Sequence, residues 1–320
     1  MRNTIGDKRC FLFITNRCHN NCIYCFMNNG SEICDMDMNT YQQILVQLKD
    51  KGIYNITFIG GEPLLHVDLQ RMIDSAHNEG FSISISTSGL STNSTINFED
   101  AASKLSDITI SLDSFDKKQN DLLRGYGAYE RAVQTIVKLR SLNIPVRVTA
   151  TITQDNLYDI FRLAEFVQNL DCFQLDIHVM SIKGGARRVP FKEVQPKDWF
   201  DIRKQLDIIK FKYPFHISYP IMWVTKDEDL DVREYCDAKI GNRLSIMPNY
   251  ECYYCTLAIG EQKPHCMAYA IHPIDISRPD FNFTSTAHFC PIERQIGSKL
   301  DDNFDYICRF IKRTTGFLKK

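Results

Sequence analysis

Strand-like and helix-like segments alternate over the first 180 residues of the chain. The strand candidates are rich in Val, Ile, Thr and Phe, and they span residues 9–15, 55–60, 82–87, 107–113, 146–152 and 174–180. Between them lie segments with apolar residues at helical spacing, the first expected to be capped by Asn39 and the second by Asp68. Such alternation indicates parallel strands joined by right-handed crossovers. We therefore predict an α/β fold, a partial (β/α)6 barrel of the TIM type.

Polar and glycine-rich residues follow the first four strand candidates. Three cysteines follow the first, and the next three are followed by "GGEP" (60–63), "TSG" (87–89) and "SLDS" (111–114). In a parallel barrel the C-terminal ends of all strands meet at one rim, where active sites are built. We therefore expect these residues to converge on one site.

The remaining sequence suggests a barrel with an extension, for which 320 residues suffice. A helix is expected over 197–211, but from about residue 214 the chain is irregular and rich in Pro, Tyr and Cys. The predicted units are a barrel over 1–190, a connecting helix and linker over 191–235, and a small irregular module over 236–320. A module of that kind needs cross-links because it buries little apolar core.

Charge and hydropathy exclude several classes of partner. The formal net charge is −1 and the pI is near 6.7, which gives no electrostatic case for nucleic acid or an anionic membrane surface. No apolar run approaches the ~20 residues of a membrane-spanning helix, and the N-terminal apolar run is too short for a signal peptide. The expected location is the cytoplasm.

Twelve cysteines are many for a chain in a reducing compartment, where metal binding is a better explanation than disulfides. Five precede residue 35, and six lie between Cys236 and Cys308. The sequence thus predicts two metal-binding regions.

The first region contains "CHNNCIYC", with Cys18, Cys22 and Cys25 close together. A four-iron cluster is fully ligated by four thiolates, so three would leave one iron open. The residues alone leave two alternatives: a zinc site completed by His19 or Cys34, or simply buried thiols.

Taken with "GGEP", "TSGL", "ISLDS" and "LLRGYG", the CxxxCxxC pattern resembles the radical S-adenosylmethionine (radical SAM) superfamily over residues 9–190. The resemblance implies a [4Fe-4S] cluster whose open iron binds S-adenosylmethionine. One electron then cleaves that cofactor into methionine and a 5′-deoxyadenosyl radical, which abstracts hydrogen from a substrate. A reductant protein of the flavodoxin or ferredoxin type would supply the electron.

The same resemblance assigns residues to the cofactor. Tyr24 would contact the adenine, and the segment of Gly60, Gly61 and Glu62 would hold the methionine ammonium. Polar contacts to the ribose and carboxylate would come from Ser111 and Arg124, with further contacts from Thr87 and Thr151. Asp113, at a strand end, is a candidate base or substrate contact.

The second cysteine region resembles the SPASM/twitch extensions that hold auxiliary iron–sulfur clusters. Leu244, Ile246 and Pro248 keep the register of their β-hairpin, whereas the usual turn glycine is replaced around Asn249-Tyr250, where Asn is expected to tolerate positive φ. We predict one auxiliary [4Fe-4S] cluster, with two clusters or a zinc site as alternatives. Its expected ligands are Cys236, Cys255, Cys290 and one of Cys252 or Cys266.

A cysteine left over from this set could return a hydrogen atom to a substrate radical, and Cys252 is a candidate. The predicted substrate is a peptide or protein that is epimerised, cross-linked or oxidised. The alternative is dehydrogenation or rearrangement of a small sugar or aminocyclitol. A non-catalytic iron–sulfur electron carrier is the alternative from another class, and "GGEP", Ser111 and Arg124 argue against it.

Overall fold

The computed structural model describes residues 8–27, 32–209, 213, 215–225, 242–253, 255–256, 259, 267–268, 304–306 and 312–314. The strands are β1 (Arg9–Thr15), β2 (Asn55–Gly60), β3 (Ser82–Thr87), β4 (Asp107–Ser111), β5 (Val146–Ile152), β6 (Gln174–Val179), β7 (His216–Pro220), β8 (Trp223–Thr225), β9 (Arg243–Ile246), β10 (Cys252–Tyr253), β11 (Met267–Ala268), β12 (Phe304–Tyr306) and β13 (Lys312–Thr314). The α-helices are α1 (Met38–Asp50), α2 (Leu69–Asn78), α3 (Phe98–Ala101), α4 (Lys117–Arg124), α5 (Ala128–Ser141), α6 (Ile160–Asn169) and α7 (Pro196–Ile209). Short 3-10 helices are η1 (Pro63–Leu65), η2 (Ala102–Lys104), η3 (Leu157–Asp159) and η4 (Gly184–Arg188).

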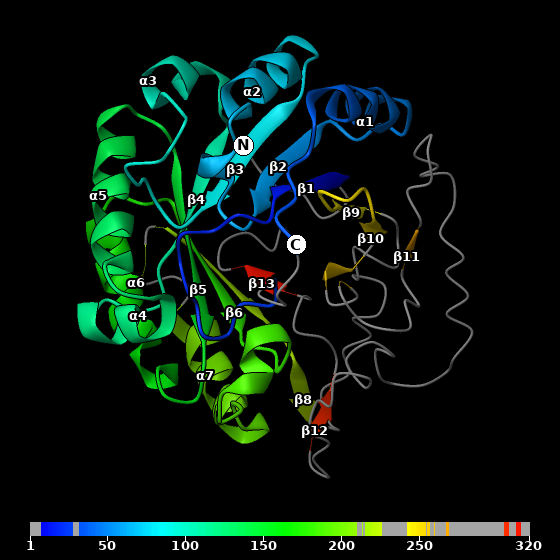
Figure 1. Cartoon of the computed structure of the whole chain (residues 1–320). Helices are drawn as coiled ribbons and strands as arrows, with labels where there is room; N and C mark the ends of the chain where they lie inside the picture. The colour runs from blue at the N-terminus through cyan, green and yellow to red at the C-terminus, as the bar shows by residue number, and fades with distance from the viewer. Residues whose placement is uncertain are drawn as a thin grey trace.

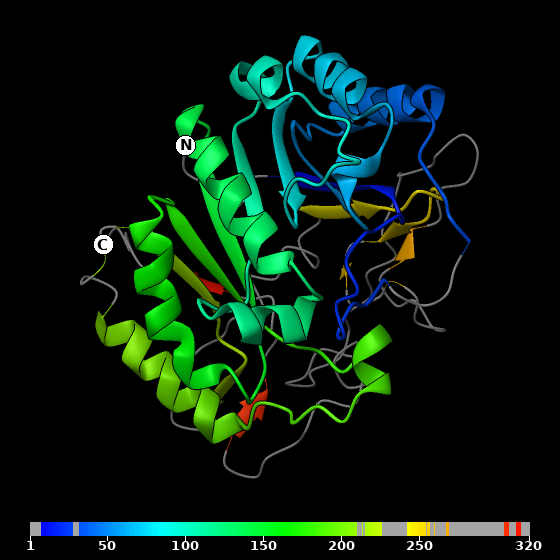
Figure 2. The same cartoon turned by 60° about the vertical axis from the view of Figure 1, so that its left-hand side comes forward.

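Strands β1 to β7 form a parallel sheet in chain order, and helices cover its convex side (Figures 1 and 2). All six predicted strands are present as β1–β6. The expectation of irregular chain from residue 214 is wrong for 216–220, because β7 pairs in parallel with β6 and extends the barrel by one strand. The α/β prediction with a mostly parallel sheet is confirmed.

Apolar and polar residues alternate along these strands, so the sheet has one apolar face and one more polar face. Leu12, Phe58, Ile85, Ile108 and Val146 occupy directly paired positions on five successive strands, and all are fully buried. This face packs under the helices and forms the core. The other face lines the concave side, and its half-buried positions on β3–β6 include Ser84, Ser86, Thr109, Ser111, Thr149, Thr151, Asp176 and His178.

The expected N-cap of the first helix is one element that the structure corrects. Asp37, not Asn39, caps α1, because its Oδ1 accepts from the Thr40 amide at 3.0 Å. Asp68 does precede α2, but its side chain makes no capping bond; its Oδ1 instead accepts from Arg71 at 2.7 Å. Both carboxylates lie near a helix start, and only local backbone geometry decides which of them caps.

The predicted hairpin in the second cysteine region is present as β9 and β10, and β9 pairs in parallel with β1. The hairpin therefore extends the barrel sheet. At its turn, Tyr250, not Asn249, has positive φ, at 69°. The Tyr250 hydroxyl donates to Asp37 Oδ2 at 2.5 Å, so the strained turn is tied to the start of α1.

Replacing Tyr250 with phenylalanine is expected to destabilise the iron-free protein by about 1 kcal/mol at pH 7, because it removes a partly exposed bond to a carboxylate. The Tyr250 hydroxyl, together with the Thr40 amide, lowers the pKa of Asp37 to about 2. A depressed pKa contributes stability above the ordinary value of 3.8, and that contribution is lost as the pH falls through about 2. Urea unfolding should show that the difference in free energy of unfolding between the wild type and Tyr250→Phe becomes smaller as the pH falls from 3.8 to about 2. A gap independent of pH would contradict the assignment.

No helix in the described part of the chain is both long enough and apolar enough to span a membrane.

Candidate active site

The loop after β1 carries the three clustered cysteines along the rim of the barrel. The Cys25 amide donates to the Cys22 carbonyl at 3.1 Å, which forms a tight turn. The Ile23 amide donates to the Leu123 carbonyl at 3.0 Å, and the Cys22 thiol lies 3.8 Å from the Arg124 carbonyl. The loop is thus fixed against the end of α4.

The three thiols suit an iron–sulfur cluster better than a single ion. Burial, with smaller contributions from Glu62, Cys22 and Cys25, raises the pKa of Cys18 to about 12. Burial also raises the pKa of Cys22, which the Arg124 guanidinium partly offsets. Within the described residues no three candidate ligands converge on one metal ion, whereas a cluster spreads its thiolate ligands over several irons. Three thiols on one short, fixed loop fit such a cluster.

Gly60 and Gly61, at the end of β2, bring the backbone against the start of this loop. The Gly61 amide donates to the Thr15 carbonyl at 2.8 Å, and the Glu62 amide donates to the Arg17 carbonyl at 2.6 Å. A Cβ on Gly60 would lie 2.2 Å from the Thr15 carbonyl oxygen, and one on Gly61 would lie 2.1 Å from that of Arg17. Only glycine permits this approach.

Replacing Gly61 with alanine should therefore separate the two segments, lower stability by about 3 kcal/mol and reduce iron loading. A matched control is Gly52→Ala, where a Cβ meets nothing within 4 Å and only the positive φ of 67° is unfavourable. That control should cost about 1 kcal/mol and leave iron loading unchanged. Thermal unfolding and iron analysis check both; equal behaviour of the two variants would refute the close approach.

Glu62 is fully buried, and its carboxylate joins β2 to the turn after β3. Oε1 accepts from the Thr87 hydroxyl at 2.5 Å, and Oε2 accepts from the Ser88 amide at 2.8 Å and hydroxyl at 2.5 Å. Burial raises the pKa of Glu62, and these bonds partly oppose the rise. Ser88, which the sequence reasoning did not single out, also lies 3.4 Å from His19 Nε2 of the cysteine loop.

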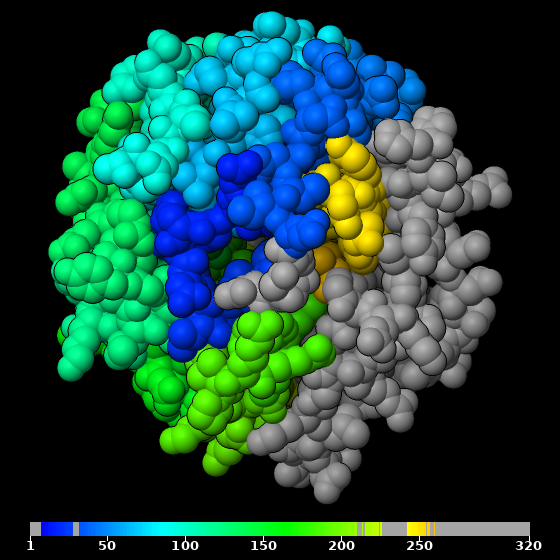
Figure 3. All heavy atoms as spheres, viewed as in Figure 1, coloured from blue at the N-terminus to red at the C-terminus, as the bar shows by residue number. Residues whose placement is uncertain are grey.

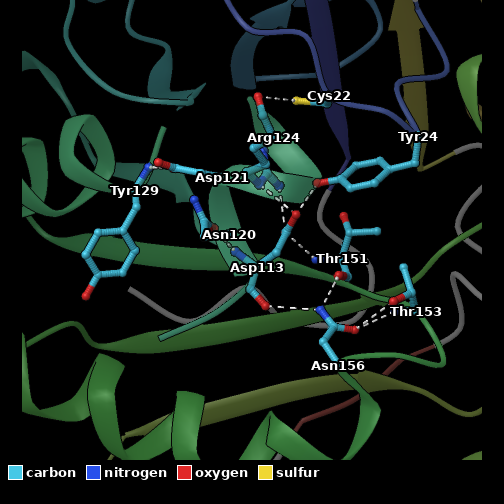
Figure 4. Close-up of polar contacts among 10 residues, drawn as sticks. All are labelled: Cys22, Tyr24, Asp113, Asn120, Asp121, Arg124, Tyr129, Thr151, Thr153 and Asn156. Carbon is cyan, nitrogen blue, oxygen red and sulfur yellow. Dashed lines mark hydrogen bonds and ion pairs between the residues drawn. The ribbon is translucent and has the colours of Figure 1, made fainter. Parts of the chain in front are cut away.

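A second buried group surrounds Asp113, just beyond β4 (Figure 4). Asp113 Oδ1 accepts from Arg124 Nη2 at 2.8 Å and from the Thr151 amide at 2.8 Å, and Oδ2 lies 2.8 Å from Arg124 Nε. The Tyr24 hydroxyl also donates to Oδ2, and the Arg124 guanidinium lies 5.7 Å from the centre of the Tyr24 ring. Burial by itself would lower the pKa of Arg124, but the neighbouring Asp113 carboxylate outweighs this effect, so the pKa of Arg124 is raised.

This network indicates a structural role for Asp113, in contrast to the candidate base expected from the sequence. It is 1% exposed and both its oxygens are occupied, so it holds Arg124, Tyr24 and β5 together. Its backbone is fixed as well, because its amide donates to Asn120 and its carbonyl accepts from Asn156. Asn120 and Asn156 were also missed, although both lie within residues 9–190, the part of the chain that resembles the family.

Ser111 and Thr151 lie on the concave face at the ends of β4 and β5, half-buried beside this network. The site residues thus form two groups, one around Glu62 with Thr87 and one around Asp113 with Arg124. The cysteine loop contacts both. Viewed from the side of the loop, the molecule is hollowed at its centre, with blue residues of the N-terminal segment at the rim (Figure 3).

The second cysteine region is only partly described. Cys236, Cys266 and Cys290 lie outside the described residues. Cys252 is fully buried, and it pairs with Ile246, which pairs with Leu12 on the helix-covered face. Burial raises the pKa of Cys252 to about 12. Cys255, which follows β10, is 7% exposed.

Comparison with known proteins identifies the family. Residues 12–166 match the sequence model of the radical SAM superfamily. Just under half of the chain is thus similar to the radical SAM superfamily. Among its relatives, the uncharacterized protein MJ0907 of Methanocaldococcus jannaschii is 29% identical over 78% of this chain and 85% of its own length.

Relatives with named roles match about half of this chain. The mycofactocin maturase MftC of Mycobacterium ulcerans is 23% identical over 54% of this chain and 47% of its own length. An S-adenosylmethionine-dependent nucleotide dehydratase of Selenomonas ruminantium is 30% identical over 50% of this chain and 61% of its own length. The matches thus span about half the length of these relatives.

Among solved structures, Streptococcus suis SuiB bound to S-adenosylmethionine superposes with a TM-score of 0.67 and 19% identity. The superposition covers 82% of this chain and 63% of SuiB. It shows that this chain shares the SuiB fold well beyond residue 166.

Proposed function

We propose that this chain is a radical SAM enzyme that cleaves S-adenosylmethionine reductively and uses the radical to modify a peptide or protein. The observation that carries the proposal is the convergence at one rim of three loop thiols, the buried Glu62 and the Asp113–Arg124 pair. An electron carrier needs the thiols but has no use for the other two groups.

In the proposed enzyme the thiolates of Cys18, Cys22 and Cys25 would hold a [4Fe-4S] cluster. When bound, the cluster and S-adenosylmethionine together supply the 5′-deoxyadenosyl radical that abstracts hydrogen. A reductant protein of the flavodoxin or ferredoxin type would provide the electron, and we expect the reaction in the cytoplasm.

The chain's own residues would bind and orient the cofactor. Glu62 would offer its carboxylate to the methionine ammonium, and Gly60 and Gly61 would keep this segment against the cysteine loop. Arg124, held by Asp113 through Nε and Nη2, would bring its positive charge to the methionine carboxylate. Tyr24, held through its hydroxyl by Asp113, would present its ring to the adenine, and Ser111, Thr87 and Thr151 would support these contacts.

We further propose one auxiliary [4Fe-4S] cluster in a SPASM/twitch-like module over 236–320. Cys236, Cys255, Cys290 and Cys266 are the ligands we favour, because Cys252 faces the helix layer. For the same reason Cys252 does not serve the proposal as a hydrogen donor: its thiol lies on the opposite face of the sheet from the barrel interior.

Two observations support a peptide substrate. MftC is named a maturase, and SuiB, whose fold this chain shares, is known in a structure bound to the precursor peptide SuiA. The concave face of β3–β6 also carries hydroxyls, Asp176 and His178, which suits a polar chain better than an apolar ligand. The alternative, a small polar molecule, is favoured by the nucleotide dehydratase relative.

Co-expression with short peptides encoded beside the gene tests the substrate class. The proposal predicts that one such peptide changes in mass, or gains solvent deuterium at one residue, when the wild-type chain is present and not when Cys22→Ala is. Unmodified peptides, together with a purified enzyme that consumes nucleotides or sugars, would establish the small-molecule alternative.

A further inference from the structure

Lys183 is a buried cation beside the cysteine loop that none of the roles above uses. It lies between β6 and η4 and is 4% exposed. Its Nζ lies 5.9 Å from the centre of the Phe26 ring and 3.4 Å from the Thr256 carbonyl oxygen, to which it donates. Phe26 follows Cys25 and Thr256 follows Cys255, so the ammonium bridges the two cysteine segments.

The backbone after Lys183 packs directly on the third cysteine. The Gly185 amide donates to the Cys25 carbonyl at 2.8 Å. A Cβ on Gly184 would lie 2.6 Å from Phe26 Cα, and one on Gly185 would lie 2.9 Å from the Ile23 carbonyl oxygen. The two glycines therefore let the chain approach the loop closely enough to bring the lysine beside it.

We propose that Lys183 is a positioning residue for the cluster held by Cys18, Cys22 and Cys25, and that its positive charge fixes the loop and raises the cluster's reduction potential. The inference rests on the proposed function. Adding an electron makes the cluster more negative, and a cation buried nearby stabilises the reduced form more than the oxidised form. Because Lys183 is 4% exposed, water screens its charge less than it screens that of a surface lysine.

The test uses the full chain, reconstituted anaerobically with iron and sulfide, in four variants. Lys183→Met removes both charge and hydrogen bond, Lys183→Gln removes the charge but keeps a donor, and Lys183→Arg keeps the charge. Arg188→Met is the matched control, because Arg188 is an exposed cation of the same short helix. The readout is the midpoint potential of the cluster whose EPR signal changes when S-adenosylmethionine is added.

The expected result is a lower midpoint potential in Lys183→Met and Lys183→Gln, and the wild-type potential in Lys183→Arg and Arg188→Met. If the two neutral variants cannot hold iron while Lys183→Arg can, the charge is shown to fix the loop. A wild-type potential in iron-replete Lys183→Gln overturns the inference, as does loss of iron from Lys183→Arg. A wild-type chain with no EPR signal sensitive to S-adenosylmethionine would instead refute the proposed function.

Discussion

Cys22→Ala is expected to abolish cleavage of S-adenosylmethionine and to lower the iron content by about four atoms per chain. The loop supplies three thiolates to a cluster that can take four. Without Cys22 only two of them would remain. The Cys22 thiol also faces the Arg124 carbonyl at 3.8 Å, so the loss occurs where the loop meets the proposed cofactor site. Iron analysis and EPR of the anaerobically reconstituted variant measure the effect.

Cys172→Ala is the matched control for that substitution. Cys172 is a buried cysteine after α6, and its thiol lies 3.9 Å from the Leu170 carbonyl oxygen, outside the cysteine loop. Its replacement should lower stability modestly and leave both iron content and cofactor cleavage intact. Retention of full iron and activity by Cys22→Ala would show that the three loop thiols do not hold the reactive cluster.

Asp113→Ala is expected to lower the free energy of unfolding by about 3–5 kcal/mol, because it leaves the Arg124 guanidinium buried without its counter-charge. The Arg124 side chain is 8% exposed and that of Asp113 is fully buried. The substitution also releases the Tyr24 hydroxyl and the Thr151 amide, so binding of S-adenosylmethionine should weaken as well. Chemical denaturation and equilibrium binding to the iron-loaded protein measure the two effects.

Two further variants test whether the unpaired charge of Arg124 causes the loss of stability. Asp171→Ala removes the carboxylate from another arginine pair, but Asp171 is 83% exposed, so that change should cost less than about 1 kcal/mol. The double variant Asp113→Ala with Arg124→Met should recover part of the lost stability, because no unpaired charge stays buried, yet its binding of the cofactor should remain weak. Full recovery of binding would remove Arg124 from the cofactor site.

The barrel could be predicted from the sequence because buried residues recur at every second position in a strand and at every third or fourth position in a helix. β1, β2, β3 and β5 begin and end at the predicted residues. β7 was missed because the short alternating run in residues 213–220, "YPFHISYP", lies between two prolines. The pairing of β9 with β1 joins segments more than 200 residues apart, and no local pattern carries that information.

The candidate site was predictable to a similar degree. Motifs placed Glu62, Arg124 and the three cysteines at one rim, since the ends of parallel strands must meet there. They did not reveal that Asp113 pairs with Arg124, because Asp113 lies just beyond a strand and Arg124 ends the helix that follows. Cys252 was judged by its neighbours in sequence, whereas strand register places its thiol on the helix-covered face.

Formation of 5′-deoxyadenosine by the iron-loaded chain tests the central claim most directly. The chain would be reconstituted anaerobically and mixed with S-adenosylmethionine and a strong reductant, with and without the neighbouring peptides, and the product quantified by liquid chromatography. We expect 5′-deoxyadenosine in the presence of reductant and none from Cys22→Ala. If iron-replete wild-type protein binds S-adenosylmethionine but yields no 5′-deoxyadenosine under either condition, radical cleavage is not the function of this site.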